Sequence, residues 1–349
     1  NWATKEDSLL AYNSENGNFK PLPFDFTRAS SATVVNKAGL IETVGSGEPR
    51  IDFSNDTKGA LLLEPQRSNL ITYSEEFSNW AQDGATTLDN NIISPDGTLN
   101  ASKITFNSGN ERVYTFANTT NGSFSAYFKG VQGKKVKLRD NSGTYRTEIT
   151  LTENWVRHYL YKETANTNIQ IQNVDANEVY VWGAQVEEGS YATSYIPTSG
   201  QSGGVTRVAD ACNNGGNEQV INSTEGVLYA QISALSNSGD TYRLISLNNG
   251  SGTNTNRIFI GYTNNNSIYA AINNTTIAFT TSSFDVKNFN KVAVVYNGSI
   301  AKLFINGLEV GSGITNAPTL SGLSRVDFSG SSTGANEFKG NTKDVRVYT

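Results

Sequence analysis

The chain has 349 residues, enough for two or three domains that bury their own cores without metal ions or disulfide staples. Its net charge is −5 and its basic residues form no stripe, which argues against nucleic acid as a partner. No apolar run approaches the roughly 18 residues of a membrane span, so we expect no membrane insertion. Asn, Ser, Thr and Gly are abundant and no long stretch keeps a helical period, which predicts an all-β protein.

Residues 1–69 contain short apolar segments separated by Pro and Gly, such as 21–26 and 45–49, and they end in the apolar run 60–63. This pattern predicts an irregular N-terminal arm with a few short strands. Such a segment packs against its own domain or against a neighbouring subunit. We therefore expect the arm to serve attachment or oligomerisation, with an ordinary edge of the next domain as the alternative.

Residues 70–197 carry strand-length runs about every ten residues, which is the spacing of a β-sandwich. The run 135–139 alternates apolar and charged residues, as a half-exposed strand does. Residues 198–224 are rich in Gly, Ser and Asn. This composition predicts a flexible linker between two domains.

Residues 225–349 return to strand-length runs and are predicted to form a second sandwich. Two pairs, Asn297-Gly298 and Asn306-Gly307, separate three of these runs. Asn and Gly readily adopt the positive φ angles that a two-residue hairpin turn requires. The two pairs therefore predict a three-stranded meander with an Asn-Gly step in each turn.

Several stretches of the first 210 residues resemble one group of proteins; they are 26–36, 39–42, 49–53, 61–70, 180–198 and 205–210. The earlier stretches look like the N-terminal region of bacteriophage structural proteins, namely fibre, spike or appendage proteins. The stretch 180–198 is similar to the closing strand of the jelly-roll, carbohydrate-module-like domain of the same proteins. The resemblance implies a jelly roll for residues 70–197 and a place on a virion.

The last 140 or so residues resemble concanavalin A-like lectin domains of the laminin G type, through the runs 302–310 and 338–345. The resemblance implies a second sandwich with the concanavalin A-like topology. That fold carries lectins, hydrolases, lyases and inert structural modules, so the fold by itself does not assign a function.

The residues that catalysis requires are sparse. The single histidine, His158, lies in a strand-like run and the single cysteine, Cys212, lies in the linker, so neither predicts a nucleophile with its base. A zinc site needs several His or Cys ligands, which this chain lacks. Glu187 and Glu188 would point to opposite faces of a strand, and no Glu has an Asp two residues later. We therefore predict that the protein is not an enzyme.

Sugar binding is better supported, because β-sandwich lectins stack exposed aromatic side chains on sugar rings and bond hydroxyls with Asn, Asp, Gln and Arg. The candidate glycan-binding residues are Tyr242, Arg243, Arg257, Tyr262, Tyr269 and Asn273 in the second sandwich, with Trp80 and Tyr145 in the first. The alternative for each aromatic residue is packing in a core.

Calcium is the cofactor that the sequence leaves open, since it takes oxygen ligands from Asp, Asn and backbone carbonyls in loops. The candidate loops begin at Asp140 and Asp175. Each is equally compatible with a turn stabilised by its own Asp side chain.

These observations lead to a non-enzymatic phage virion appendage, a head fibre, spike or tail fibre, that binds host cell-surface polysaccharide for adsorption. We expect it on the virion surface, held to other virion proteins through its arm and assembled as a homo-oligomer, most plausibly a trimer, since multivalency offsets weak single-site affinity. Two alternatives remain: a secreted polysaccharide-degrading enzyme or its carbohydrate-binding module, and a purely structural virion decoration protein.

Overall fold

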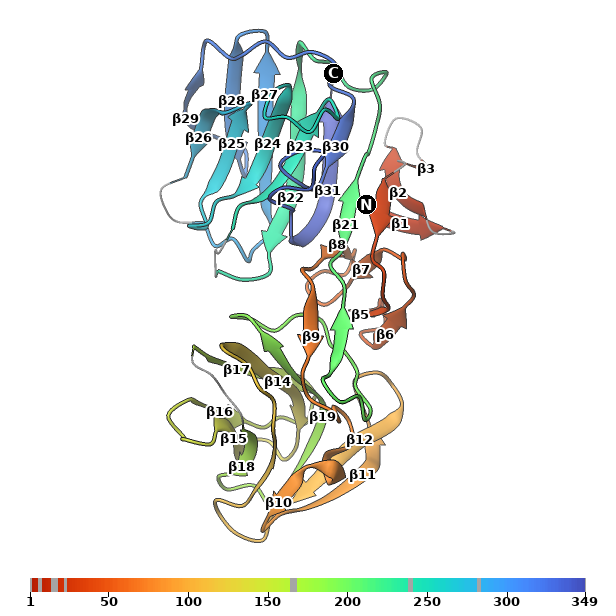
Figure 1. Cartoon of the computed structure of the whole chain (residues 1–349), viewed down its shortest axis with the longest axis vertical. Coiled ribbons are helices and arrows are strands. Elements are labelled where there is room, and N and C mark those ends of the chain that lie inside the picture. The colour runs from red at the N-terminus through yellow and green to blue at the C-terminus, as the bar shows by residue number, and fades with distance from the viewer. Residues whose placement is uncertain are drawn as a thin grey trace. The chain divides into compact units, whose positions relative to one another are not determined.

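The structure is a computed structural model that describes residues 2–5, 8–13, 18–21, 24–163, 168–237, 241–280 and 284–348. Strands dominate these residues, and the helical element among them is a 3-10 turn, η1 (Phe77–Asn79) (Figure 1). The all-β prediction is confirmed. No helix in the described ranges is long and apolar enough to cross a membrane.

The chain divides into two compact units: residues 1–29, 44–65 and 209–349 form unit 1, and residues 30–43 and 66–208 form unit 2. Unit 1 is a sandwich of a seven-stranded and a five-stranded sheet. The larger sheet has the order β29 (Leu308–Ile314), β28 (Ile300–Ile305), β27 (Asn290–Asn297), β22 (Glu225–Ala234), β31 (Gly340–Tyr348), β8 (Ala60–Leu63) and β7 (Arg50–Asp52). The smaller has the order β26 (Thr275–Phe279), β25 (Ile268–Ile272), β24 (Arg257–Tyr262), β23 (Arg243–Asn248) and β30 (Arg325–Asp327).

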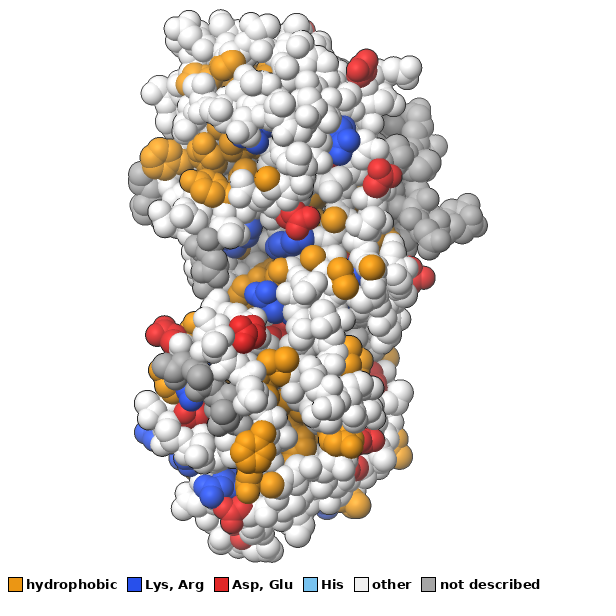
Figure 2. Space-filling view, viewed as in Figure 1, with side chains coloured by type: hydrophobic (Ala, Val, Ile, Leu, Met, Phe, Trp, Pro, Cys, Tyr) orange, Lys and Arg blue, Asp and Glu red, His pale blue; other side chains and the backbone are white. Residues whose placement is uncertain are grey.

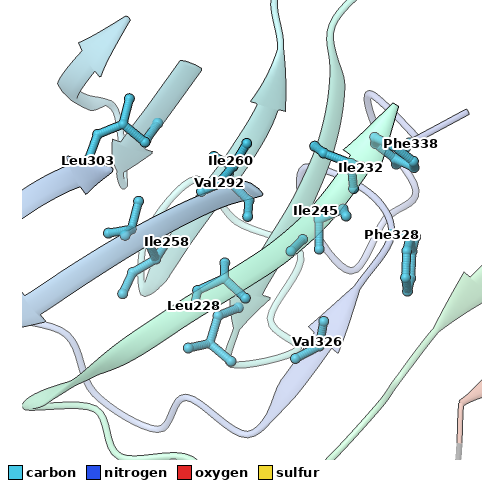
Figure 3. Close-up of a cluster of buried hydrophobic side chains, with 14 of the residues drawn as sticks. Leu228, Ile232, Ile245, Ile258, Ile260, Val292, Leu303, Val326, Phe328 and Phe338 are labelled. Atoms are coloured by element: carbon cyan, nitrogen blue, oxygen red, sulfur yellow. The ribbon is translucent and has the colours of Figure 1, made fainter. Parts of the chain in front are cut away.

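Alternating residues of these strands fill the core of unit 1. In β22, Leu228, Ala230 and Ile232 are buried, and in β27 every second residue from Asn290 to Tyr296 is buried. Figure 3 shows side chains from both sheets meeting in this core, among them Ile245, Ile258, Ile260, Val292 and Leu303. Period-2 alternation is what places one face of each strand in the core.

The predicted meander is present as β27, β28 and β29, with one turn shifted from its predicted place. Ile305 pairs with Leu308, so Asn306 and Gly307 are the central turn residues, with φ of 52° and 89°. Asn297, however, pairs with Ile300, which makes Gly298 and Ser299 the central residues of the first turn. Gly298 alone has a positive φ there, 57°, as in turns that take Gly at the first central position.

The N-terminal arm departs from the predicted boundaries, because its pieces belong to the two units rather than to one segment. Strands β7 and β8 extend the seven-stranded sheet beside β31, and β4 (Asp25–Thr27) pairs with β21 (Ala211–Asn213) from the expected linker. Strands β5 (Ala32–Val35) and β6 (Ile41–Val44) form a hairpin at residues assigned mainly to unit 2. Strands β1 (Trp2–Lys5), β2 (Ser8–Asn13) and β3 (Asn18–Pro21) form a sheet of their own.

A buried ionic cluster, consisting of Arg28, Arg50, Glu64 and Asp210, joins four distant stretches of unit 1. Asp210 accepts from Arg28 Nη1 at 3.1 Å and forms a second ion pair with Arg50. Arg50 Nη1 lies 2.7 Å from Glu64 Oε2. All four side chains are almost wholly out of solvent, so each charge depends on its partners.

Unit 2 is a sandwich of two five-stranded sheets. One has the order β10 (Ala81–Asp83), β13 (Arg112–Thr115), β18 (Ile169–Asn173), β15 (Lys135–Asp140) and β16 (Arg146–Thr150). The other has the order β11 (Thr86–Ile93), β12 (Leu99–Thr105), β19 (Glu178–Glu188), β14 (Gly122–Lys129) and β17 (Val156–Lys162). Val136, Ile171, Phe124 and Val181 represent the core between them. A short ladder of β9 (Arg67–Asn69) and β20 (Val205–Arg207) lies within the same unit, and β20 falls in the expected linker.

Candidate functional site

The outer face of the five-stranded sheet of unit 1 carries the most complete set of predicted glycan-binding residues. Residues that pair directly across antiparallel strands share a face, so the register defines rows of side chains on it. The first row is Leu244, Gly261, Tyr269 and Phe279; the second is Asp327, Ser246, Phe259, Ala271 and Thr276. Apolar side chains therefore gather at the β24–β26 side of the face, and polar ones toward β30.

The aromatic patch, as we name Tyr242, Phe259, Tyr269 and Phe279, lies on this face. The ring centroids of Tyr242 and Tyr269 are 6.0 Å apart, and those of Phe259 and Tyr269 are 5.4 Å apart. Tyr242 is 39% exposed and Phe279 is 55% exposed, whereas Phe259 forms the buried floor. Figure 2 shows hydrophobic side chains gathered over the strands that Figure 1 labels β24, β25 and β26. The patch offers solvent two exposed rings beside the partly buried Tyr269.

Gly261 makes room for the patch. It lies between Leu244 and Tyr269 in the first row and has a φ of 155°. A Cβ at this position would lie 2.0 Å from the carbonyl oxygen of Arg243 on the neighbouring strand. A glycine is therefore required here, and it leaves the first row without a side chain between Leu244 and Tyr269.

Arg257 and Asn273, two of the candidate glycan-binding residues, lie beside the patch. The Arg257 guanidinium carbon is 5.0 Å from the centre of the Phe259 ring, and Nη1 donates to Gly330 O at 2.6 Å. Asn273 occupies the turn between β25 and β26 with a φ of 52°, and its Oδ1 accepts from Arg257 N at 3.2 Å. Burial lowers the pKa of Arg257.

Tyr262 and Arg243 do not belong to the exposed surface, contrary to the prediction. Tyr262 lies on the opposite face of β24 from Phe259 and points into the core. It is 0% exposed there, and its hydroxyl donates to Ile232 O at 3.0 Å. Burial raises its pKa. Arg243 is also buried, with its guanidinium carbon 5.2 Å from the Tyr262 ring centre and Nη2 donating to Asn266 Oδ1 at 2.7 Å. A wholly buried phenol cannot stack on a sugar, so Tyr262 leaves the candidate set.

The candidates of unit 2 do not form a second patch. Trp80 belongs to the core, where its ring centroid is 4.7 Å from that of Phe77. Tyr145 is partly buried and lies under Lys162 Nζ, 5.3 Å from the ring centre. The large outer aromatic residue of this unit, Trp182, is covered by the unit's own Ile41 and Tyr195. Trp182 is thus used for packing, whereas Tyr159 on β17 (Val156–Lys162) of the same sheet is exposed.

The carboxylates of both predicted calcium loops have bonding partners within the protein. Asp140 is buried and forms an ion pair of 2.9 Å with Lys162 Nζ. Although burial opposes it, hydrogen bonds from Ser142 and Lys162 hold the pKa of Asp140 below its ordinary value. Asp175 is exposed and accepts from Lys135 N at 2.6 Å, a bond that ties its loop to the start of β15. In the described part of the chain, no group of three or more His, Cys, Asp or Glu residues could hold a metal ion.

His158 and Cys212 occupy packing positions. His158 lies on β17 with its ring centroid 6.1 Å from that of Phe128, and burial lowers its pKa. Cys212 lies on β21 in the core of unit 1, and burial raises the pKa of its thiol, which disfavours the thiolate. Cys212 therefore has the environment of a structural cysteine.

One carboxylate pair escaped the sequence reasoning. In unit 2, Asn100 Nδ2 donates to Glu75 Oε2 and to Asp96 Oδ2, each at 3.0 Å. Burial raises the pKa of Glu75, whereas the pKa of Asp96 is lowered by hydrogen bonds from Ser94 and Thr98 that outweigh its burial. These bonds close the turn between β11 and β12, and Glu75 also accepts from Tyr195 Oη at 2.8 Å. We interpret the pair as part of this turn.

Phe259 and Phe279 also escaped the sequence reasoning, although a signal for them was present. Two sets of residues alternate along β24. One consists of Arg257, Phe259 and Gly261; the other consists of Ile258, Ile260 and Tyr262 and is aliphatic except for Tyr262. Alternation identifies two faces in such a strand but not which of them is outermost. Phe279 lies opposite Tyr269 because of the register between β25 and β26, and no local sequence pattern predicts that register.

Comparison with known proteins bears on the C-terminal part of the chain. Residues 228–349 match the model Laminin_G_3, described as the concanavalin A-like lectin/glucanases superfamily. This part is therefore a concanavalin A-like, laminin G-type domain. No curated protein matches the chain. Among solved structures, the mouse laminin alpha1 chain, domains LG4-5, matches with 10% sequence identity, 82% of this chain and 90% of that chain covered, and a TM-score of 0.26, a likeness too weak to carry an argument.

Proposed function

We propose that the chain is a non-enzymatic virion appendage protein, a head fibre, spike or tail fibre, that binds host-surface polysaccharide through the aromatic patch. The observation that carries this proposal is an exposed aromatic surface on a sheet face of a lectin-type domain. The virion assignment is supported by the stretches of the first 210 residues that resemble phage structural proteins.

The chemistry of the patch suits a saccharide. The C–H face of a sugar ring packs on an aromatic side chain, while hydroxyls need hydrogen-bond partners at the rim. Tyr269 and Phe279 supply adjacent rings, and the amide of Asn274 and the hydroxyl of Thr276 are exposed on the same side of the sheet end. One such surface binds weakly, which favours several copies on a trimeric appendage acting together on the outer surface of the virion.

Glycan binding is tested with the full chain on an array of bacterial surface polysaccharides. Tyr269→Ala and Phe279→Ala should each weaken binding roughly fivefold, corresponding to about 1 kcal/mol for one aromatic contact. Tyr159→Ala is the matched control, because Tyr159 is 57% exposed but lies on β17 of unit 2. Equal losses of affinity for all three variants would contradict glycan binding by the aromatic patch. An array on which no glycan binds would favour the alternative of a purely structural virion decoration protein.

Catalysis is tested on the polysaccharides that bind. We expect incubation with the full chain to release neither reducing ends nor unsaturated products. Release of either product would overturn the non-enzymatic part of the proposal. Glu75→Gln and Asp96→Asn would then show whether the carboxylate pair of unit 2 is responsible.

A further inference from the structure

Arg257 differs from three other arginines of unit 1, each of which lies beside an acidic group. Arg28 and Arg50 share Asp210, and Arg325 lies 2.9 Å from Asp327. Among the described residues, Arg257 has no carboxylate within ion-pair distance. The carboxylates bordering its sheet face are already paired, Asp327 with Arg325 and Glu337 with Lys339 at 2.9 Å.

The hydrogen bonds of Arg257 also leave donor capacity unused. A guanidinium has five N–H donors in a fixed plane. Nη1 makes a 2.6 Å bond to Gly330 O, Nη2 makes a long 3.4 Å contact with Asn274 Oδ1, and Nε has no partner in the described structure. Burial lowers the pKa of Arg257, which is the expected response of a cation that no anion compensates.

The position of this cation connects it with the aromatic patch. Its guanidinium carbon is 5.0 Å from the Phe259 ring centre, and Phe259 in turn contacts Tyr269. On the other side lies Asn274, an exposed turn residue whose weak contact with Nη2 an incoming acceptor can replace. An anion at the turn would therefore meet Arg257 while its own sugar ring rests on the patch.

Building on the proposed glycan binding, we propose that the patch selects anionic saccharides, with a carboxylate or sulfate group of the sugar bound by Arg257. A planar guanidinium pairs with either group through parallel N–H bonds, and such charge-assisted bonds are stronger than those between neutral groups. The aromatic rings supply affinity for the ring of the sugar, and Arg257 supplies the preference for charge.

The test uses the full chain and four oligosaccharide probes of equal length: hexuronic acid oligosaccharides, their carboxyl-reduced neutral counterparts, sulfated oligosaccharides, and the same oligosaccharides after desulfation. We expect at least one anionic probe to bind about tenfold more tightly than its neutral counterpart, with an affinity that falls as salt is added. Which anionic probe binds distinguishes carboxylate from sulfate.

Arg257→Gln should bring the affinity for the anionic probe down to that for the neutral one, and Arg257→Lys should keep part of the preference because it keeps the charge. Arg346→Gln is the control, since Arg346 pairs with Asp344 on β31 of the other sheet. The salt dependence of the unaltered protein provides a readout that needs no variant.

The outcomes separate the two proposals. Equal affinity for anionic and neutral probes would overturn the selection of anions and leave glycan binding standing. A preference for anions that survives Arg257→Gln in a folded protein would overturn the assignment to Arg257. Failure of every saccharide, neutral or charged, to bind would overturn the proposed function and this inference together.

Discussion

At the scale of single residues, the buried ionic cluster explains four stretches of sequence that have no obvious local role. Arg28, Arg50, Glu64 and Asp210 each come from a different stretch among those that resemble phage structural proteins. A buried charge is stable only beside its partners, so the cluster requires the four stretches to be present together. We expect its main effect to be to specify how distant segments of unit 1 meet.

Asp210→Asn keeps the shape of the side chain but leaves two buried arginines short of a counter-charge. We expect it to lower the free energy of unfolding by about 3–5 kcal/mol, measured by urea denaturation. Glu309→Gln is the control, since its pair with Lys302 is exposed and should be worth about 0–1 kcal/mol. A loss for Asp210→Asn no larger than that control would show that the cluster does not hold the segments together.

Glu75 should give the stability of the protein a recognisable pH dependence. Burial raises its folded-state pKa above the ordinary value of 4.5. The group therefore contributes stability that is fully present below pH 4.5 and is lost as the pH rises through the folded-state pKa. The free energy of unfolding of the unaltered protein, minus that of Glu75→Gln, should fall between pH 4 and pH 7. A difference that rises over this range would show that the pKa is lowered instead.

At the scale of elements, a bulge in β19 keeps both halves of this eleven-residue strand facing the same core. Val179 and Val181 are buried before the bulge, and Ala184 and Val186 after it, so the buried positions change from odd to even numbers. The register against β14 shifts between Ser125 and Tyr127. Gly183 lies at this point with a φ of 64°, a conformation that favours glycine.

Gly183→Ala should destabilise the protein by about 2 kcal/mol. The alanine would have to keep a left-handed backbone conformation, and its Cβ would lie 3.3–3.5 Å from the rings of Tyr127 and Tyr195. Gly133→Ala is the matched control, with a φ of 86° and no atom within 4 Å of the added Cβ. It should cost about 1 kcal/mol from the backbone alone. Thermal unfolding of both variants measures the difference, and equal costs would show that the contacts at Gly183 are unimportant.

At the scale of the whole molecule, the region that matches the lectin family is smaller than the sandwich it belongs to. The match begins at residue 228, yet β7 and β8 complete the seven-stranded sheet beside β31. Phe24, Leu61 and Leu63 from the arm also lie in the core of the same sandwich. A fragment without these residues would expose the edge of β31 and part of the core, a condition that promotes aggregation.

Residues 225–349 expressed alone should therefore aggregate or unfold without a cooperative transition, as followed by thermal melting and size-exclusion chromatography. A polypeptide in which residues 44–65 are joined to 209–349 by a Gly/Ser linker should recover a cooperative transition, because it restores β7, β8 and three members of the ionic cluster. If the shorter fragment unfolds as cooperatively as the linked one, the arm strands are dispensable for this sandwich.

Much of the fold could be predicted from local patterns, because alternation and turn preferences act over a few residues. Asn306-Gly307 forms the turn expected of it, and the strand 135–139 has the predicted half-exposed pattern. The first meander turn moved by one residue because the pairing of Asn297 with Ile300 depends on the register of two strands. Of the candidate site, Tyr242, Tyr269, Arg257 and Asn273 lie at the patch or its rim, while Tyr262 faces inward.

The sequence by itself determined an all-β chain with few groups suited to catalysis, since composition and period are local properties, and its runs 302–310 and 338–345 resemble concanavalin A-like domains. Only the tertiary structure decided that the arm supplies strands to the sandwich of unit 1, that Trp182 is covered while Tyr242 and Phe279 are exposed, and that Arg257 has no ion pair with a carboxylate among the residues the structure describes. The physical reason is common to all three. Burial and charge compensation depend on which distant segments pack together, and no short stretch of sequence records its long-range partners.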